Sequence, residues 1–422
     1  MKKKLVALLT ATAMSVMALT GCGDAAAEPA AQATEAAEAA AETEAAQTEA
    51  AQTEAASDIK VGVIYIGDEN EGYTAAHMAG IEAMKAALGL SDDQVIAKTN
   101  IGEDENCYDA AVDLADQGCK IVFANSFGHE DYLLRAAAEY PDVQFAHATG
   151  YQATSSGLSN MHNYFTAVYE SRYVSGVVAG LKLNEMIESG KITADAAKVG
   201  YVGAYPYAEV ISGFTSFFLG VRSIVPTATM EVQYTSSWAD MTAENEVATA
   251  LIADGCVLIS QHADTTGAPT ACEAAGVPCV GYNVDMTSVA PTCALTSASI
   301  NWGPYYTYAV QSVMNGESFD TDWCRGYEED ADKITPLNDA AIAEGTAEKV
   351  AEVEAAIKDG SLHVFDTTTF TVAGKSLEDA IADGTVDASY ASYVSDGYFH
   401  ESELASAPAF ALIIDGITEL TE

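Results

Sequence analysis

Short apolar runs alternate with longer amphipathic stretches from residue 59 onward. The run 60–66 (KVGVIYI) predicts a buried strand, because it is short and almost continuously apolar. Residues 74–88 predict a helix, because Met78, Ile81 and Met84 recur at the spacing of one helix face. The alternation continues with a helix over 110–118, a strand over 120–124, a helix over 129–140 and a strand over 143–147.

A second series of the same kind begins at Lys198. It predicts strands over 198–203, 230–234, 256–260 and 279–282, with helices over 207–221 and 241–254 and a third helix ending at Ala275. Regular alternation of strands and helices of this length indicates parallel sheets covered on both faces. The sequence therefore predicts an α/β fold with two doubly wound parallel-sheet lobes.

A long helical stretch, 164–187, separates the two series. We expect a first lobe over 58–165, completed by about 290–345, and a second lobe over 166–289, completed by about 346–422. Ligands of such sheets bind beyond the carboxyl ends of the strands.

The first residues have the pattern of a bacterial lipoprotein signal. Lys2, Lys3 and Lys4 precede an apolar run over 5–19, and Leu19-Thr20-Gly21-Cys22 follows. A retained membrane helix is the alternative, but the run is too short to cross about 30 Å of hydrocarbon at about 1.5 Å per residue. We therefore expect a signal peptide over 1–21, a lipid on Cys22 and a location on the extracytoplasmic face of the cell membrane.

The segment 22–57 is built almost entirely from Ala, Glu, Gln and Thr, without aromatic or large aliphatic side chains. Such a composition cannot bury a core, so we expect a disordered tether between the lipid and the folded part.

Charge disfavours two classes of partner. The chain carries a net charge of −44, and removal of Lys2, Lys3 and Lys4 with the signal makes it more negative still. A surface so acidic repels nucleic acid and anionic lipid.

Seven cysteines besides Cys22 have irregular spacing and no metal-binding pattern, so we expect free, buried thiols and no metal or cofactor.

The loops after the predicted strands are rich in aromatic, amide and carboxylate side chains and poor in Lys and Arg. Aromatic rings would sandwich a planar ligand, and amides and carboxylates would read its hydrogen-bonding edges. The candidate ligand-binding residues are Tyr73, Phe127, Tyr205, Glu209, Trp238, Gln261, His262, Asp264, Asn283, Asp285, Asn301 and Trp302. Asn125 is a further amide in these loops.

The sequence disfavours two other kinds of site. No glycine-rich phosphate cradle of either common type follows a predicted strand, which disfavours a phosphorylated ligand. The run 124–128 (ANSFG) approximates the strand–turn–helix setting of a nucleophile elbow, with His262 or His363 as the possible partner of Ser126. Neither histidine has a clear acid partner in the expected order, so we expect a binding protein rather than an enzyme.

Several runs together resemble the basic membrane protein family of ABC importer lipoproteins, which includes the purine nucleoside receptors. The resemblance covers about residues 59–327. It is carried by the runs 126–128 (SFG), 145–150 (FAHATG), 169–173 (YESRY), 213–222, 237–240 (SWAD), 261–264 (QHAD), 281–286 (GYNVDM) and 301–306 (NWGPYY).

The resemblance implies a type I periplasmic-binding fold that closes on its ligand about a hinge and delivers it to an ABC permease. By position, Tyr73 would stack on a base, and Asn283 and Asp285 fall on the family's Gly-x-Asp-x-Asp segment. The lysine with which nucleoside receptors hold the ribose is missing from 298–302 (ASINW). We therefore expect a purine-type nucleobase or nucleoside as ligand, with the free base favoured. A receptor for another small polar solute and a surface-sensing lipoprotein without transport remain the alternatives.

Overall fold

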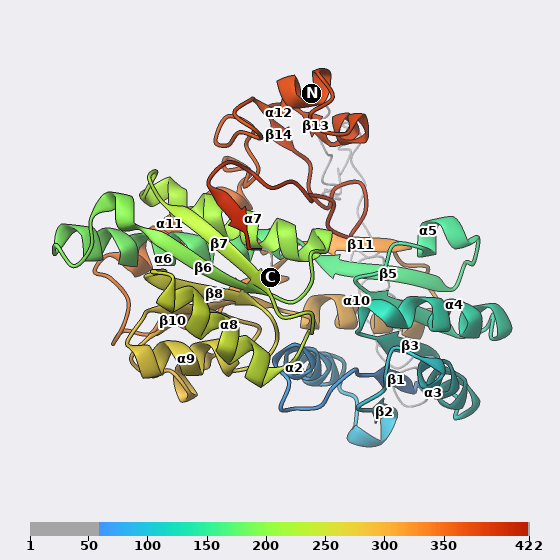
Figure 1. The fold of residues 1–422 in the computed structure, drawn as a ribbon. Coiled ribbons are helices and arrows are strands. Elements are labelled where there is room, and N and C mark those ends of the chain that lie inside the picture. The colour runs from blue at the N-terminus through green and yellow to red at the C-terminus, as the bar shows by residue number, and fades with distance from the viewer. Residues whose placement is uncertain (1–58, 421–422) are drawn as a thin grey trace, which may run out of the picture. The chain divides into compact units, whose positions relative to one another are not determined.

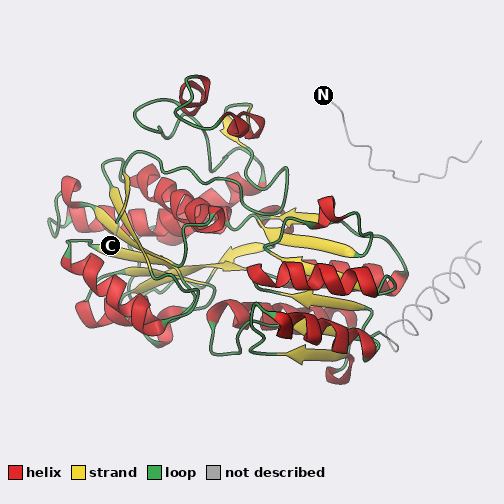
Figure 2. Cartoon of the chain, turned by 45° about the vertical axis from the view of Figure 1, so that its right-hand side comes forward, coloured by secondary structure: helices red, strands yellow, loops and turns green. Residues whose placement is uncertain are grey.

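A computed structural model of the chain describes residues 59–420. The expected signal peptide over 1–21, the lipidated Cys22 and the tether over 22–57 lie outside the described residues. Within residues 59–420, two sheets carry the fold, and helices cover both faces of each (Figures 1 and 2). The expected α/β fold with two doubly wound lobes is confirmed.

The first sheet has six parallel strands in the order β11-β5-β4-β3-β1-β2. Its strands are β1 (Val61–Ile64), β2 (Val95–Lys98), β3 (Ile121–Ala124), β4 (Gln144–Ala148), β5 (Met161–Thr166) and β11 (Asp322–Arg325). Its main helices are α2 (Gly72–Leu88), α3 (Glu105–Asp116), α4 (Glu130–Glu139) and α10 (Gly303–Asn315), with the short α5 (Ala153–Ser156) beside β5.

The second sheet has the order β12-β10-β9-β8-β6-β7-β15 and is parallel except for β12. Its strands are β6 (Lys198–Gly203), β7 (Thr229–Tyr234), β8 (Leu258–His262), β9 (Cys279–Tyr282), β10 (Ala294–Ile300), β12 (Asp332–Ile334) and β15 (Ile417–Glu419). Its main helices are α6 (Tyr169–Glu188), α7 (Ala208–Ile224), α8 (Met241–Ala253), α9 (Gly267–Ala275) and α11 (Thr346–Lys358).

Burial explains why these runs form strands. All four residues of β1 and all four of β3 are buried, because helices pack on both faces of the sheet. One apolar cluster joins β1 and β3 to α2 and α10, and another joins them to α3 and α4. The second sheet is covered in the same way by α6 and α7 on one face and by α8 and α9 on the other. These clusters hold the strand ends rigidly, and the loops that follow the strands form the site.

The structure differs from the expected elements at β5. Residues 164–187 were expected to form one helix, but Met161–Thr166 is a strand between β4 and β11, and the helix α6 begins only at Tyr169. Polar residues within β5 make it hard to identify as a buried strand from the sequence. His162 and Asn163 are buried, and their side chains are hydrogen-bonded to Gln144 and Glu130 respectively. The predicted elements also lack β2, β10, β11, β12 and β15.

The segment 290–345 does not complete the first lobe alone. Its strand β10 pairs with β9 on one side and with β12 on the other, so both β10 and β12 belong to the second sheet. Only α10 and β11 join the first sheet and its helices. Within the described residues the chain therefore passes between the sheets three times, after β5, after β10 and after β11.

The C-terminal residues 363–420 add α12 (Leu377–Ala382), the 3₁₀ helix η6 (Ala388–Tyr393), and the hairpin of β13 (Val394–Ser395) and β14 (Tyr398–Phe399). These elements lie on the side of α7 in Figure 1. The chain then returns to the second sheet, where β15 pairs with β7. The seven cysteines in the described residues are free, and all but the half-buried Cys324 are buried.

Candidate functional site

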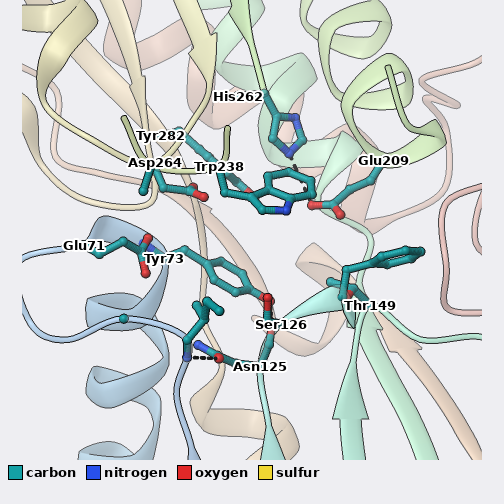
Figure 3. A pocket seen from close by; sticks show the side chains of 14 residues that line it. Glu71, Tyr73, Asn125, Ser126, Thr149, Glu209, Trp238, His262, Asp264 and Tyr282 are labelled. Atoms are coloured by element: carbon teal, nitrogen blue, oxygen red, sulfur yellow. Dashed lines mark hydrogen bonds and ion pairs between the residues drawn. The ribbon is translucent and has the colours of Figure 1, made fainter. Parts of the chain in front are cut away.

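A pocket of about 130 Å³ lies between the two sheets, at the carboxyl ends of their strands (Figure 3). Each lobe supplies one wall. The lining residues are Ile66, Gly67, Glu71, Tyr73, Asn125, Ser126, Phe127 and Thr149 from the first lobe, and Glu209, Trp238, Ala239, His262, Asp264 and Tyr282 from the second.

The first wall is built on the start of α2 and the loop after β3. The Glu71 carboxylate caps α2 by accepting hydrogen bonds from the backbone N–H groups of Tyr73 and Thr74, at 2.6 and 2.8 Å. This cap fixes the first turn of the helix, which carries Tyr73. The Tyr73 hydroxyl donates to the Asn125 carbonyl at 2.8 Å, and the Asn125 amide oxygen accepts from the Ile66 N–H at 2.9 Å. The Tyr73 ring is therefore held in place before any ligand arrives.

Trp238, in the loop after β7, forms the facing wall. Figure 3 shows it on the opposite side of the pocket from Tyr73. The Trp238 carbonyl accepts a hydrogen bond from the Asp264 N–H at 2.9 Å, which ties this loop to the end of β8. The Tyr205 ring meets the indole edge-on, with ring centroids 5.2 Å apart. These contacts orient the indole toward the pocket.

Three carboxyl groups line the pocket, and burial raises the pKa of each. The pKa of Glu209 rises to about 7, although the buried Arg172 guanidinium opposes the rise. Burial and the nearby Glu71 raise the pKa of Asp264 well above its usual value. Burial also raises the pKa of Glu71. Carboxyl groups in this state can accept a hydrogen bond when ionised and donate one when protonated.

Arg172 on α6 lies behind the second wall rather than in the pocket. Its guanidinium is buried, donates to the Gln261 carbonyl at 2.7 Å and lies 3.6 Å from the centre of the Tyr282 ring. His262 lies 3.2 Å from Glu209, and burial together with Arg172 lowers the pKa of His262, so the imidazole is neutral. None of the lining residues is lysine or arginine, and the Arg172 guanidinium lies against the ring of Tyr282, which lines the pocket.

The two walls touch each other across the pocket. The backbone N–H of Gly72, at the start of α2, donates to the Asp264 carbonyl at 3.0 Å. A side chain on Gly72 would bring its Cβ within 3.0 Å of that same oxygen. Phe127 of the first lobe also stacks on Tyr207 of the second, with centroids 5.7 Å apart. The structure therefore describes the lobes closed around the pocket.

Half of the candidate ligand-binding residues line the pocket and half do not. Those that line it are Tyr73, Phe127, Glu209, Trp238, His262 and Asp264. Those that do not are Tyr205, Gln261, Asn283, Asp285, Asn301 and Trp302.

The residues outside the pocket have other partners. Tyr205 supports Trp238 from behind. Gln261 is buried and its amide donates to the carbonyls of Ala263 and Thr265. Asn283 donates to the Asp264 carboxylate at 2.8 Å, so it positions a pocket residue without lining the pocket.

Three further candidate residues lie elsewhere in the structure. Asp285 is exposed and caps the next 3₁₀ turn through the Thr287 N–H. Asn301 donates to the Asp330 carbonyl. Trp302 is fully buried in the first lobe, where it stacks on His77 with centroids 3.9 Å apart. We therefore revise the expectation that these three side chains contact a ligand.

The candidate residues omitted several that line the pocket. Glu71, Ser126 and Ala239 lie in loops that directly follow strands, so their position in the sequence was a usable signal. Thr149 follows β4 and its backbone has a positive φ of 68°. Threonine rarely adopts this conformation, so the sequence gives no indication of it. Tyr282 ends a buried strand and was indistinguishable from a core residue.

The nucleophile elbow is not assembled around Ser126. Its hydroxyl donates to the Glu103 carboxylate at 2.6 Å rather than to a histidine. His262 is paired with Glu209, and His363 stacks on Tyr398. Among residues 59–420, no group of three or more His, Cys, Asp or Glu side chains is arranged to hold a metal ion.

One family model matches most of the chain. Residues 59–362 match the family described as PnrA-like ABC transporter substrate-binding proteins. A purine-binding protein of Brucella abortus is 32% identical over 329 residues, which cover 76% of this chain and 89% of the relative. A putative ABC transporter glucose-binding protein of Haloferax volcanii is 30% identical over 250 residues, covering 59% of this chain and 60% of the relative.

Solved structures agree on the fold. A solute-binding protein of an ABC transporter from Conexibacter woesei has a TM-score of 0.58 at 21% identity, and the match covers 72% of this chain and 98% of that one. In the part of the chain that the structure describes, no helix has the length and apolar character needed to cross a membrane.

Proposed function

Because the chain belongs to the PnrA-like family of ABC transporter substrate-binding proteins, we propose that it captures a purine-type nucleobase between its lobes and delivers it to an ABC permease. The observation that carries this proposal is a small pocket with an aromatic ring on each side and buried carboxyl groups between them. The purine-binding relative from Brucella abortus supports the ligand class.

The rings of Tyr73 and Trp238 would stack on the two faces of a planar heterocycle. A well-placed aromatic pair contributes about 0.5–1.5 kcal/mol beyond the burial of area. The Tyr73 hydroxyl and the Trp238 carbonyl are already hydrogen-bonded to the protein. These two residues therefore lose little conformational freedom when a ligand binds.

The carboxyl groups of Glu209 and Asp264 would bind the hydrogen-bonding edge of the base. Purine bases present several N–H donors and ring-nitrogen acceptors, and a buried carboxyl group with a raised pKa can serve either kind. A hydrogen bond to a charged group contributes about 1.5–3 kcal/mol. This arrangement gives selectivity for N–H-rich ligands over hydrocarbons of the same shape.

The size of the pocket favours a free base over a nucleoside. Its volume of about 130 Å³ is close to the roughly 150 Å³ of an engineered cavity that admits benzene. A ribose would have to lie outside this space, and each hydroxyl left unpaired on burial costs about 1–3 kcal/mol.

Calorimetric titration with adenine and adenosine tests this proposal. We expect adenine to bind with micromolar or tighter affinity, about −8 kcal/mol or better, and at least as tightly as adenosine. Adenosine monophosphate should bind far more weakly than either, because carboxyl groups and no cations line the pocket. A preference for adenosine above tenfold would mean that other groups hold the ribose.

Glucose is the second candidate ligand, because the relative from Haloferax volcanii is described as a putative glucose-binding protein. Aromatic faces and carboxylates also suit a sugar ring, so the same titration includes glucose. Tight binding of glucose without binding of any nucleobase would replace the purine proposal with this one.

We also propose that a lipid on Cys22 anchors the protein to the extracytoplasmic face of the membrane. Cys22→Ser should leave the protein uncleaved or soluble, while the wild type stays with the membrane fraction. Cys324→Ser, a cysteine of the folded part, is the control and should partition as the wild type does. Equal partitioning of the Cys22 variant and the wild type would contradict the anchor. A surface-sensing role without transport would be indicated by the lack of a neighbouring permease and ATPase in the genome.

A further inference from the structure

The C-terminal residues 363–420 lie beyond the matched family region, which ends at residue 362. They are firmly attached to the second lobe, because their aromatic residues belong to the same apolar cluster as α6 and α7. Phe365 and Phe410 stack within this cluster, with ring centroids 4.5 Å apart. The segment is therefore an integral part of the second lobe.

The same segment also reaches the first lobe. The backbone N–H of Ser406 donates to both carboxylate oxygens of Asp322 on β11, at 3.2 and 3.1 Å. Glu401 is buried and holds the following turn, since one of its oxygens accepts from the N–H groups of Ala409 and Phe410 at 3.0 and 2.9 Å. Residues 401–410 thus contact both lobes.

A second and larger space, which we call the outer chamber, lies between this segment and the pocket. It has a volume of about 750 Å³. It adjoins the pocket, because Phe127, Thr149 and Glu209 line both. Its remaining walls are Tyr151, Pro206, Tyr207, Ala208, Ser389, Tyr390, Tyr393, Ala405, Ala407, Pro408 and Ala409.

Aromatic rings from all three sides face the outer chamber. Phe127, Tyr151 and Tyr207 are among the few large apolar side chains left exposed in residues 59–420, with exposed fractions of 42, 60 and 44%. Tyr390 and Tyr393 come from η6 of the C-terminal segment and are half-buried. Exposed rings gathered on one concave surface are typical of a binding site rather than of ordinary surface.

We propose that the outer chamber is a subsite for an uncharged aromatic or apolar substituent on the heterocycle held in the pocket. This inference rests on the proposed function. The pocket has room for one small heterocycle. A substituent that points from it toward Phe127 and Glu209 would enter the outer chamber, which these two residues also line. None of the described lining residues is lysine or arginine, and Glu209 stands at the border, so the subsite disfavours anionic substituents.

Calorimetry with adenine, N6-benzyladenine and 9-benzyladenine tests the subsite, because the two benzyl compounds extend the base from opposite ends. We expect at least one of them to bind wild type about tenfold more tightly than adenine. In Tyr151→Ala and in Tyr390→Ala, the ratio of the dissociation constant of adenine to that of the tighter-binding benzyl compound should fall toward one. Tyr151 is the safer variant for folding, because its side chain is 60% exposed.

Leu404→Ala is the matched control. Leu404 is as exposed as Tyr151 and lies on the same C-terminal segment as Tyr390, but it does not line the outer chamber. It should leave the ratio as in wild type. If adenine binds and neither benzyl compound binds more tightly, or if the gain survives in both tyrosine variants, the subsite is wrong and the proposed function stands. If adenine and both benzyl compounds fail to bind, the proposed function and the subsite are both wrong.

Discussion

Replacing Trp238 by alanine should raise the dissociation constant for adenine about 100-fold. The indole forms one face of the pocket, and no other aromatic residue lines the pocket on the loop after β7. Truncation of an aromatic side chain at a central binding contact costs about 2–4 kcal/mol, and about 2.7 kcal/mol corresponds to the expected change. Trp238→Phe should restore part of the affinity, because phenylalanine keeps a smaller stacking face.

The matched control is Met241→Ala, three residues after Trp238 at the start of α8. Met241 is 57% exposed and does not line the pocket, so its replacement should change the dissociation constant by less than twofold. Melting temperatures of all three variants show whether the fold is kept. A folded Trp238→Ala variant that binds adenine within threefold of wild type would refute the stacking role.

The location of the pocket could be predicted from the sequence, because it follows from one rule about parallel sheets. Trp238 and Asp264 lie in the loops after β7 and β8, and Glu209 lies in the first turn of the helix that follows β6. The carboxyl ends of such strands meet at one edge. The apolar runs themselves stood out because helices cover both faces of each sheet. Alternation of strands and helices was therefore enough to predict the two lobes and the cleft loops.

Side-chain direction could not be predicted in the same way. Trp302 and Asp285 also follow strands, yet one side chain is buried against His77 and the other points to solvent. The direction of Trp302 depends on its packing against His77 of α2, which is distant in sequence, whereas Asp285 turns outward to cap the adjacent η4 turn (Met286–Ser288). Thr149 entered the pocket through a backbone conformation that threonine rarely adopts.

The course of the chain between the lobes was hidden for a related reason. Strand β5 contains buried polar residues whose hydrogen-bond partners lie on other strands and helices. Their pattern along the chain looks neither like an alternating strand nor like a continuous apolar one. Only the pairing of β5 with β4 and β11 reveals it as a strand.

Glu401→Gln should stabilise the protein at pH 8 and leave its stability nearly unchanged at pH 5. Burial raises the pKa of Glu401 to about 7 from the ordinary value of 4.5. Between these two values the folded protein binds a proton that the unfolded chain has released, so the stability that this proton provides is lost as the pH rises through 7. Glutamine carries no charge at either pH and keeps an amide oxygen to accept from the Ala409 and Phe410 N–H groups.

For a pKa that moves from 4.5 to about 7, the free energy of unfolding of the variant relative to wild type should increase by roughly 2–3 kcal/mol between pH 5 and pH 8. Calorimetric melting at both pH values measures it as a gain in melting temperature that appears only at pH 8. Glu344→Gln, at an exposed site, is the control and should give the same small change in melting temperature at pH 5 and at pH 8. A Glu401→Gln effect independent of pH would show that this carboxylate is ionised in the folded protein, and that residues 401–410 are held against both lobes by a charged group.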